Sequence, residues 1–166
     1  MSQNLFKNFF TYKRGFTLIE ILIVIGIIAI LAAVVIVAIN PSRQFAQAHN
    51  SQRLSNINSV LNAVGQNIAD NKGVFMCSGV AAYFTNSPMI IKTGAALDLR
   101  KCLVPTYLSE MGVDPTVGSN TCVDSTPGDC ASGSYNTGYA IATTSANRYI
   151  VSAPGAELGA TTTVTR

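Results

Sequence analysis

The chain has 166 residues, of which 48% are hydrophobic and only 11% are charged. A length of this order predicts one modest domain, here together with a membrane anchor. The formal net charge is +3, and Lys7, Lys13 and Arg14 near the N-terminus account for all of it. The remaining eight bases balance the eight acids, so charge gives no support to nucleic-acid binding by the rest of the chain.

An apolar segment follows these bases, and from Ile21 to Ile39 every residue is apolar or glycine. A helix of this length, at about 1.5 Å per residue, matches the ~30 Å of bilayer hydrocarbon. Helix is predicted because a single span has no other way to satisfy its backbone in lipid. Only Arg43 follows the span closely, so the distribution of bases predicts a cytoplasmic N-terminus and an exported remainder.

One acid, Glu20, stands at the front of the apolar run. A carboxylate in lipid costs about 2.5–3.5 kcal/mol at a helix centre and less near its end. An ordinary secretory signal has a shorter apolar run of ~7–15 residues, and a plain signal anchor explains the length but not the acid. We therefore expect Glu20 to gain a partner in an assembled state; the alternative is that its side chain reaches the membrane interface and has no other role.

The segment Gly15-Phe16-Thr17-Leu18-Ile19-Glu20, preceded by Lys13 and Arg14, resembles the class III signal of type IV prepilins and pseudopilins. The resemblance covers about residues 10–45 closely and says little about the C-terminal half. It implies that prepilin peptidase cuts after Gly15 and that the new amine of Phe16 is methylated. It also implies that Glu20 pairs with the Phe16 amine of a neighbouring subunit, which makes both residues assembly residues.

The expected fold is α+β and type IV pilin-like, with a long N-terminal helix packed on a small antiparallel β-sheet head. We expect a cleaved leader over 1–15, a transmembrane and filament-core helix over 16–40, an amphipathic continuation over 41–72, and a disulfide-containing head over 73–166. At Pro41 the helix is expected either to break or to kink and continue to about Asn71, and we favour the kink; Gly26 is a second candidate for a kink. Many members of the resembled family carry the proline about a turn earlier, where this chain has Val37.

Beyond Pro41 the apolar residues follow one helical stripe, formed by Leu54, Ile57, Leu61, Val64 and Ile68. Polar residues are expected on the other faces, namely Arg43, Gln52, Arg53, Asn56, Asn62, Gln66 and Asn67. The sequence Asn71-Lys72-Gly73 predicts the end of the helix.

In the head, residues 139–143 and 148–152 predict an antiparallel hairpin whose turn is 144–147. A third strand is expected from 86–92 or from 161–165, while 97–108 remains ambiguous. Residues 112–138 are dense in glycine, proline and small polar residues and are predicted to be loop.

Four cysteines, Cys77, Cys102, Cys122 and Cys130, follow the span, where disulfides persist. Sequence alone cannot choose among three pairings. We favour Cys122 with Cys130, which closes a turn-rich loop, and Cys77 with Cys102. A zinc site is the rival interpretation, but no Cys-x-x-Cys occurs and the sole histidine, His49, is distant in the chain.

The one cofactor considered is calcium, with Asp114, Asp124 and Asp129 as its candidate ligands, in a region where turn chemistry explains the acids equally well. His49 is expected to face solvent or a neighbouring subunit. Catalysis is not expected, because a triad would need this histidine from the helix.

The function expected from the resemblance is that of a structural subunit of a type IV pilus or pilus-like filament, used for adhesion, twitching motility or DNA uptake. Its expected partners are copies of itself in a helical filament, prepilin peptidase, the pilus assembly machinery and, before assembly, membrane lipid. The chain is expected in the inner membrane first and in a cell-surface filament afterwards. The alternatives are a type II secretion or competence pseudopilin and, in another class, a monomeric membrane-anchored surface protein that binds a ligand.

Overall fold

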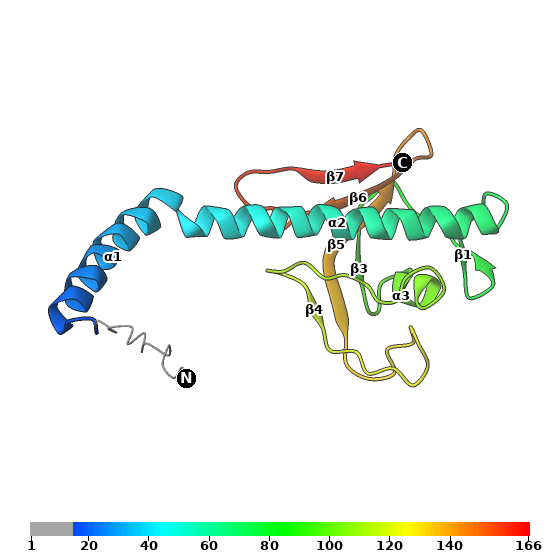
Figure 1. Cartoon of the computed structure of the whole chain (residues 1–166). Coiled ribbons are helices and arrows are strands. Elements are labelled where there is room, and N and C mark those ends of the chain that lie inside the picture. Colours follow the sequence, from blue (N-terminus) through cyan, green and yellow to red (C-terminus); the bar gives the residue numbers. More distant parts are fainter. Residues whose placement is uncertain (1–14) are drawn as a thin grey trace, which may run out of the picture. The chain divides into compact units, whose positions relative to one another are not determined.

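The computed structural model describes residues 15–166, so the predicted leader lies outside the described residues except for Gly15. The chain forms two units that meet after Pro41, and each is described by itself. The first unit contains one helix, α1 (Leu18–Ile39), and the second contains all the other elements. Together the helices and the antiparallel sheet make an α+β, pilin-like fold (Figure 1).

The helical segment is interrupted at Asn40. This residue has φ 48° and ψ 79°, in the left-handed region, where asparagine is better tolerated than most residues. The next helix, α2 (Pro41–Asp70), begins with proline, which fits a first helical position because its missing N–H is not needed there. The expectation of one helix bent through Pro41 is therefore corrected: the helix ends at Ile39 and a second one starts at Pro41. Gly26 lies inside α1.

The end of α2 follows the predicted stop signal. Lys72 and Gly73 both have positive φ, and the Gly73 N–H donates to the carbonyl of Ile68 at 2.8 Å. A left-handed residue after the last turn reverses the chain while satisfying a terminal carbonyl. The chain then forms a small hairpin, which the sequence did not predict, from β1 (Met76–Cys77) and β2 (Val80–Ala81).

The main sheet is antiparallel and has the order β3-β5-β6-β7. Its strands are β3 (Met89–Lys92), β5 (Tyr135–Thr143), β6 (Tyr149–Ala153) and β7 (Thr162–Thr165), and a short β4 (Ser119–Asn120) also pairs with β5. The predicted hairpin is confirmed as β5 and β6, with Ile141 opposite Val151. Both segments proposed for a third strand are strands, and they lie at the two edges of the sheet.

The core lies between α2 and the sheet. Ile57, Leu61 and Val64 of the predicted stripe are buried there, and each buried aliphatic side chain contributes about 1.5–3 kcal/mol. The other large hydrophobic members of this core that are less than 2% exposed are Val60, Phe75, Ile91, Leu99, Leu103, Tyr139, Ile141 and Val151. Leu99 and Leu103 come from a short helix, α3 (Leu99–Leu103), which occupies part of the ambiguous segment 97–108.

The stripe differs from its prediction at one position. Leu54 is 46% exposed, whereas its neighbour Arg53, expected on a polar face, is fully buried. Asn67, also expected on a polar face, is buried because its side chain bonds the N–H and the carbonyl of Met76. The face of α2 that meets the head thus includes two polar residues with specific partners.

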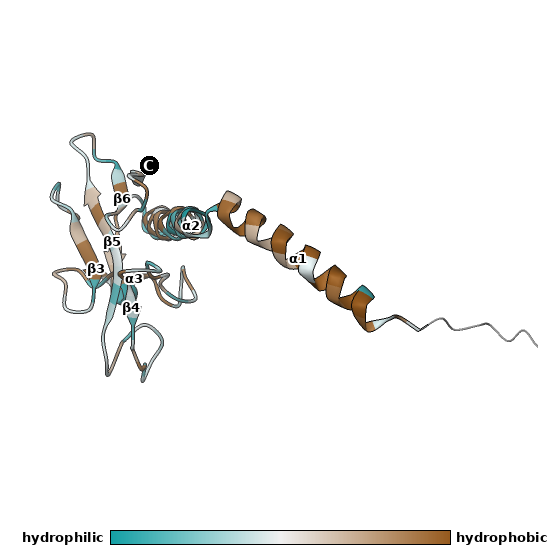
Figure 2. Cartoon of the chain, turned by 90° about the vertical axis from the view of Figure 1, so that its left-hand side faces the viewer, coloured by the Kyte–Doolittle hydropathy of each residue, from teal (hydrophilic) through white to brown (hydrophobic). Residues whose placement is uncertain are grey.

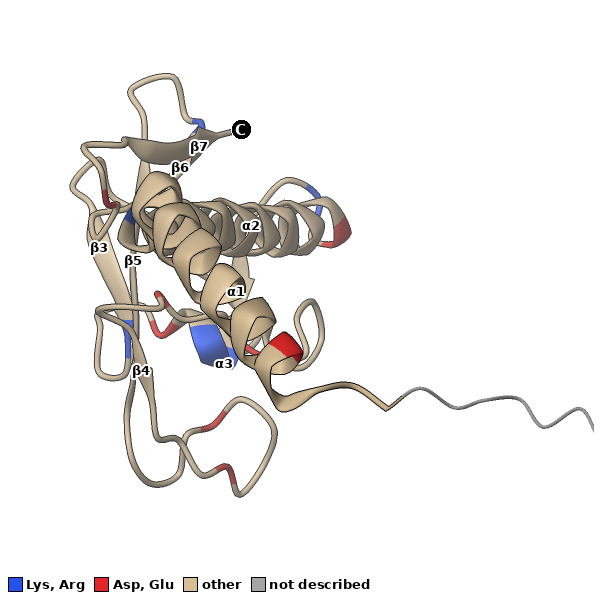
Figure 3. Ribbon diagram, turned by 60° about the vertical axis from the view of Figure 1, so that its left-hand side comes forward, with Lys and Arg blue, Asp and Glu red and all other residues tan. Residues whose placement is uncertain are grey.

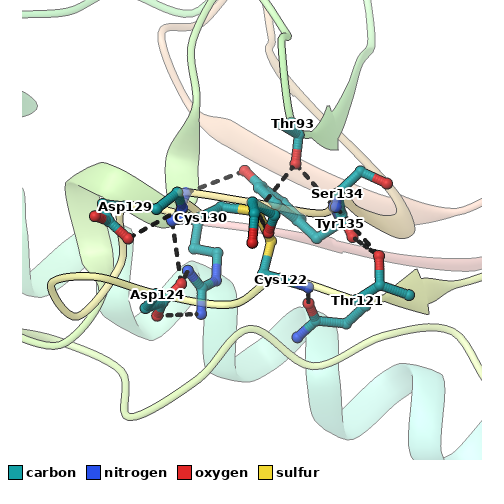
Figure 4. Close-up of a disulfide and its surroundings, with 12 residues drawn as sticks. Thr93, Thr121, Cys122, Asp124, Asp129, Cys130, Ser134 and Tyr135 are labelled. Carbon is teal, nitrogen blue, oxygen red and sulfur yellow. Dashed lines mark hydrogen bonds and ion pairs between the residues drawn. A yellow bond between two sulfur atoms is a disulfide. The ribbon is translucent and has the colours of Figure 1, made fainter.

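Two disulfides join the head, Cys77–Cys102 and Cys122–Cys130, which is the favoured pairing. The first ties β1 to α3 beneath the C-terminal part of α2. The second closes the hairpin-like loop that follows β4 (Figure 4).

Candidate functional site

The N-terminus of α1 is closed by a reciprocal pair of hydrogen bonds. The Thr17 hydroxyl accepts from the Glu20 N–H at 3.2 Å, and the Glu20 carboxylate accepts from the Thr17 N–H at 3.5 Å. This capping box satisfies backbone donors that a helix leaves without partners in its first turn. A carboxylate here also lies at the positive end of the helix dipole. Glu20 therefore has a local structural role, and its role in assembly stays a prediction.

The residues of the predicted processing and assembly sites lie together at this end. Gly15 and Phe16 precede the cap, and Phe16 is exposed on the subunit. Glu20 lies in the first turn of α1. Cleavage after Gly15 would therefore create a chain end only four residues before Glu20.

The rest of α1 is apolar and uncovered. None of its residues is buried, and Figure 2 shows the helix apolar on almost all sides. Figure 3 shows an acidic residue in its first turn, which is Glu20. Among the described residues, α1 is the one helix long and apolar enough to cross a membrane. A helix that is apolar all round is stable only when lipid or other protein covers it.

Gly26 is a gap in this apolar surface. A Cβ added there would meet no atom within 4 Å, so packing within the subunit does not require the glycine. Small residues on apolar helices let another helix approach closely. The role of Gly26 as a kink stays a prediction.

Arg53 is the centre of a cluster that joins α2 to two loops of the head. Its guanidinium donates to both carboxylate oxygens of Asp114, with Nε at 2.7 Å from Oδ2. The remaining donors reach the side chains of Asn50, Thr116 and Glu157. All five donors are thus used, which is what a buried guanidinium requires.

The surroundings of Asp114 explain its ionisation. Burial by itself raises the pKa of Asp114, but the bonds from Arg53 and from the N–H groups of Thr116 and Val117 bring it well below its usual range. Two glycines make room for the carboxylate: an added Cβ would come within 2.8 Å of the Asp114 Cβ at Gly138 and within 3.0 Å of its Oδ2 at Gly155.

His49 is partly exposed to solvent and also has a partner within the subunit. Its Nδ1 lies 2.9 Å from the Glu157 carboxylate. The neighbouring Asn50 exchanges two hydrogen bonds with the backbone of Glu157. These contacts fix the loop between β6 and β7 onto α2.

A second arginine, Arg100 of α3, holds the loop after β4. It makes paired hydrogen bonds with the carboxylates of Glu110 and Asp124, at distances of 2.6–3.1 Å. These bonds lower the pKa of Asp124 to about 2 and lower that of Glu110. Asp124 in turn accepts from the N–H groups of Gly128 and Cys130, so the ion pair and the disulfide hold the same loop (Figure 4).

The structure does not bring the three predicted calcium ligands together. Asp114 binds Arg53, Asp124 binds Arg100, and Asp129 accepts from the backbone N–H groups of its own turn. Guanidinium groups bind the first two carboxylates, and the three acids have separate partners. Over residues 15–166 no group of three or more acidic, histidine or cysteine side chains is arranged to hold a metal.

The sequence analysis predicted neither of the two arginine clusters. Arg53 stands four residues before Ile57, so the same stripe extended toward the N-terminus runs through either Arg53 or Leu54. Hydrophobicity favours Leu54 on the buried stripe, whereas in the structure Arg53 is buried and Leu54 is exposed. For Arg100, no local pattern indicates partners that lie 10 and 24 residues away.

Residues 11–36 match the family model of the prokaryotic N-terminal methylation motif, which is the class III signal of type IV pilins. No curated protein and no solved structure matches the chain. The match confirms the resemblance drawn from Gly15 to Glu20, and the fold agrees with it. A motif of this type points to a structural protein that is anchored in the membrane by its N-terminal helix.

Proposed function

We propose that the protein is a structural subunit of a type IV pilus or pilus-like filament. In this proposal prepilin peptidase cuts after Gly15, Phe16 becomes the methylated N-terminus, and α1 passes from lipid into a filament core. The single observation that carries the proposal is the uncovered apolar surface of α1 with one carboxylate, Glu20, in its first turn.

Lipid and a filament core both cover the apolar surface of α1, but they differ in whether Glu20 has a partner of opposite charge. In lipid the apolar surface is covered, but Glu20 lacks an opposite charge and is costly. In a filament the helices cover one another, and Glu20 meets the cationic amine of Phe16 from a neighbouring copy. Pairing of opposite charges at low dielectric favours the assembled state and sets the axial register.

The proposed partners and locations follow from this route. The pilus assembly machinery extracts the subunit from the inner membrane, where its N-terminus is cytoplasmic, and the filament displays the head at the cell surface. Adhesion, twitching motility or DNA uptake are the proposed uses, without direct nucleic-acid binding by this subunit. A calcium-binding acidic loop would have favoured the alternative of a secretion pseudopilin. Asp114 and Asp124 instead pair with Arg53 and Arg100, so these acids do not favour that alternative.

Glu20 variants test the proposal, and the capping box supplies a matched pair. Glu20→Gln keeps a side chain able to accept from the Thr17 N–H but removes the charge. Thr17→Ala removes the cap but keeps the charge. We expect Glu20→Gln to abolish filaments in electron micrographs of sheared fractions while the protein stays in the membrane. We expect Thr17→Ala to retain filaments. Filaments unchanged in Glu20→Gln would contradict the assembly role and favour a monomeric anchored protein.

Processing is tested by the intact mass of the protein in the sheared fraction. A chain that starts at methylated Phe16 supports export as a pilin. A chain that still starts at Met1 would contradict the proposal, because an uncut leader leaves no amine at Phe16 for Glu20 to bind.

A further inference from the structure

An open apolar groove lies between α2 and the end of the sheet, with a volume of about 340 Å³. Its lining consists of Leu61, Val64, Gly65 and Ile68 from α2, together with Asn147, Arg148, Tyr149 and Arg166. It therefore offers aliphatic and aromatic carbon with two arginine side chains, and no Asp or Glu belongs to its lining. Neither Arg148 nor Arg166 makes an ion pair with any described side chain, although the Arg166 guanidinium donates a hydrogen bond to Asn62.

Gly65 is a second observation on this groove. Glycine inside a helix lowers helix stability relative to alanine. Its φ is not in the left-handed region, and an added Cβ would meet no atom within 4 Å. Neither the backbone nor the packing of the subunit requires glycine here. The glycine leaves open space in the groove wall, which would let a side chain of another molecule approach the helix backbone closely.

The loop closed by Cys122–Cys130 has the complementary character. Val123 is 65% exposed on it. The Asp129 carboxylate is held by the N–H groups of Ser125, Thr126 and Ala131 and makes no ion pair within residues 15–166. The loop therefore carries both an exposed apolar side chain and a negative charge.

Groove and loop lie at opposite ends of the head. In Figures 1 and 3 the loop after β4, with its acidic residues, is remote from β7 and the C-terminal end, where a basic residue lies. Two complementary surfaces at opposite ends of one subunit can meet only between copies. A contact of this heterologous kind propagates as an open array when it does not close into a ring.

We propose that the Cys122–Cys130 loop of one subunit docks Val123 and Asp129 into the Arg148/Arg166 groove of a second copy of this chain. The proposal rests on the filament function proposed above and adds a head-to-head contact to the helix core. The disulfide and the Arg100–Asp124 pair hold the loop in one conformation before docking, so little ordering is needed on binding. Opposite charges at the rim orient the contact.

The test uses a photo-crosslinking amino acid, p-benzoylphenylalanine, at position 123 of the full chain in cells that assemble filaments. After illumination of sheared filaments, we expect dimers whose crosslinked peptide contains residues 61–68 or 147–149 of a second copy. The matched control places the same amino acid at Val80, which is 68% exposed on β2 and lies outside the groove and the loop. That position is expected to give no crosslink to the groove.

Two further variants test the groove without removing a packed residue. Gly65→Leu places a side chain into open space of the groove, and Gly65→Ala gives a similar gain in helix propensity with little volume. We expect Gly65→Leu to lower the crosslink yield about tenfold and Gly65→Ala to change it little, because a filled groove excludes the loop. Arg148→Glu replaces attraction with repulsion and should lower the yield about fivefold.

The outcomes separate this contact from the filament proposal. Normal filaments whose crosslinks join other segments of the head, or join another protein, would overturn the docking while leaving the filament function in place. Crosslink yields equal in Gly65→Leu and Gly65→Ala would overturn it as well. A wild-type chain that forms no filaments would instead overturn the filament proposal, on which the docking rests.

Discussion

Arg53 of α2 and Asp114 in the segment between α3 and β4 form an ion pair in which neither side chain has any exposed surface. Nε lies 2.7 Å from Oδ2. The two residues are 61 positions apart, so the pair connects the long helix to the head. Desolvation offsets much of the attraction in a buried pair of this kind, whereas a buried charge that has lost its partner is costly.

We therefore expect loss of one partner to be severe. Arg53→Met leaves Asp114 buried and uncompensated, which should lower the free energy of unfolding by about 3–5 kcal/mol. The double variant Arg53→Met with Asp114→Leu should lose less than the two single variants combined. Urea unfolding of the full chain in detergent, followed by circular dichroism because the chain has no tryptophan, measures this.

The matched control is Arg148→Met, at an exposed arginine without an ion pair among the described residues. A surface substitution should stay within about 0.5 kcal/mol. A loss in Arg53→Met no larger than in Arg148→Met would contradict the importance of the buried pair.

Acid should destabilise the head through its paired carboxylates. Arg100 lowers the pKa of Asp124 to about 2, below the ~3.9 of an unfolded chain. Because the folded pKa is the lower one, this contribution is fully present above about pH 5 and is lost as the pH falls from about 4 toward 2. Glu110 and Glu157 shift in the same direction through their bonds to Arg100 and Arg53.

The measurement is the midpoint of thermal unfolding between pH 7 and pH 2. We expect a flat region above about pH 5 and a steady fall below it. Asp124→Asn should be less stable at pH 7 but should lose less on acidification. An equal acid-induced loss in this variant would show that the Arg100–Asp124 pair is not the cause.

The two disulfides should differ in their effect on stability. They span 25 and 8 positions, and the loop-entropy relation gives about 3.5 and about 2.5 kcal/mol respectively. Replacing Cys122 and Cys130 by serine should leave the loop near its place, because Arg100 still holds Asp124. Replacing Cys77 and Cys102 should cost more, since Cys102 is part of the core. Unfolding in urea compares the two pairs, and hydrogen exchange of residues 122–132 reports on the loop.

Alanine substitutions should have opposite effects at a glycine that the structure requires and at a glycine that faces open space. Gly138 has φ +74°, and its added Cβ would lie 2.8 Å from the Asp114 Cβ. Gly138→Ala should therefore destabilise the head by about 1–3 kcal/mol. Gly65→Ala, in the helix interior with no atom near, should stabilise the chain by about 0.5–1 kcal/mol. Unfolding midpoints of the same sign in both variants would contradict this assignment.

The sequence by itself determined the features that depend on neighbours along the chain. The anchor, the motif from Gly15 to Glu20, the stop signal at Asn71-Lys72-Gly73 and the β5–β6 hairpin all rest on local pattern. Hydrophobic periodicity and turn chemistry act over a few residues, so a linear reading captures them. The favoured cysteine pairing also agreed with the structure, although sequence spacing could not exclude the others.

Only the tertiary structure decided where the charges go. Arg53 and Arg100 look like ordinary surface residues in the sequence, yet each is buried among carboxylates brought in from distant segments. Because of these ion pairs, Asp114 and Asp124 lie in two separate clusters and not in the single calcium site predicted from the sequence. The physical reason is that a buried charge is tolerated only where every hydrogen-bonding group is matched, and this match depends on the whole packing of the head.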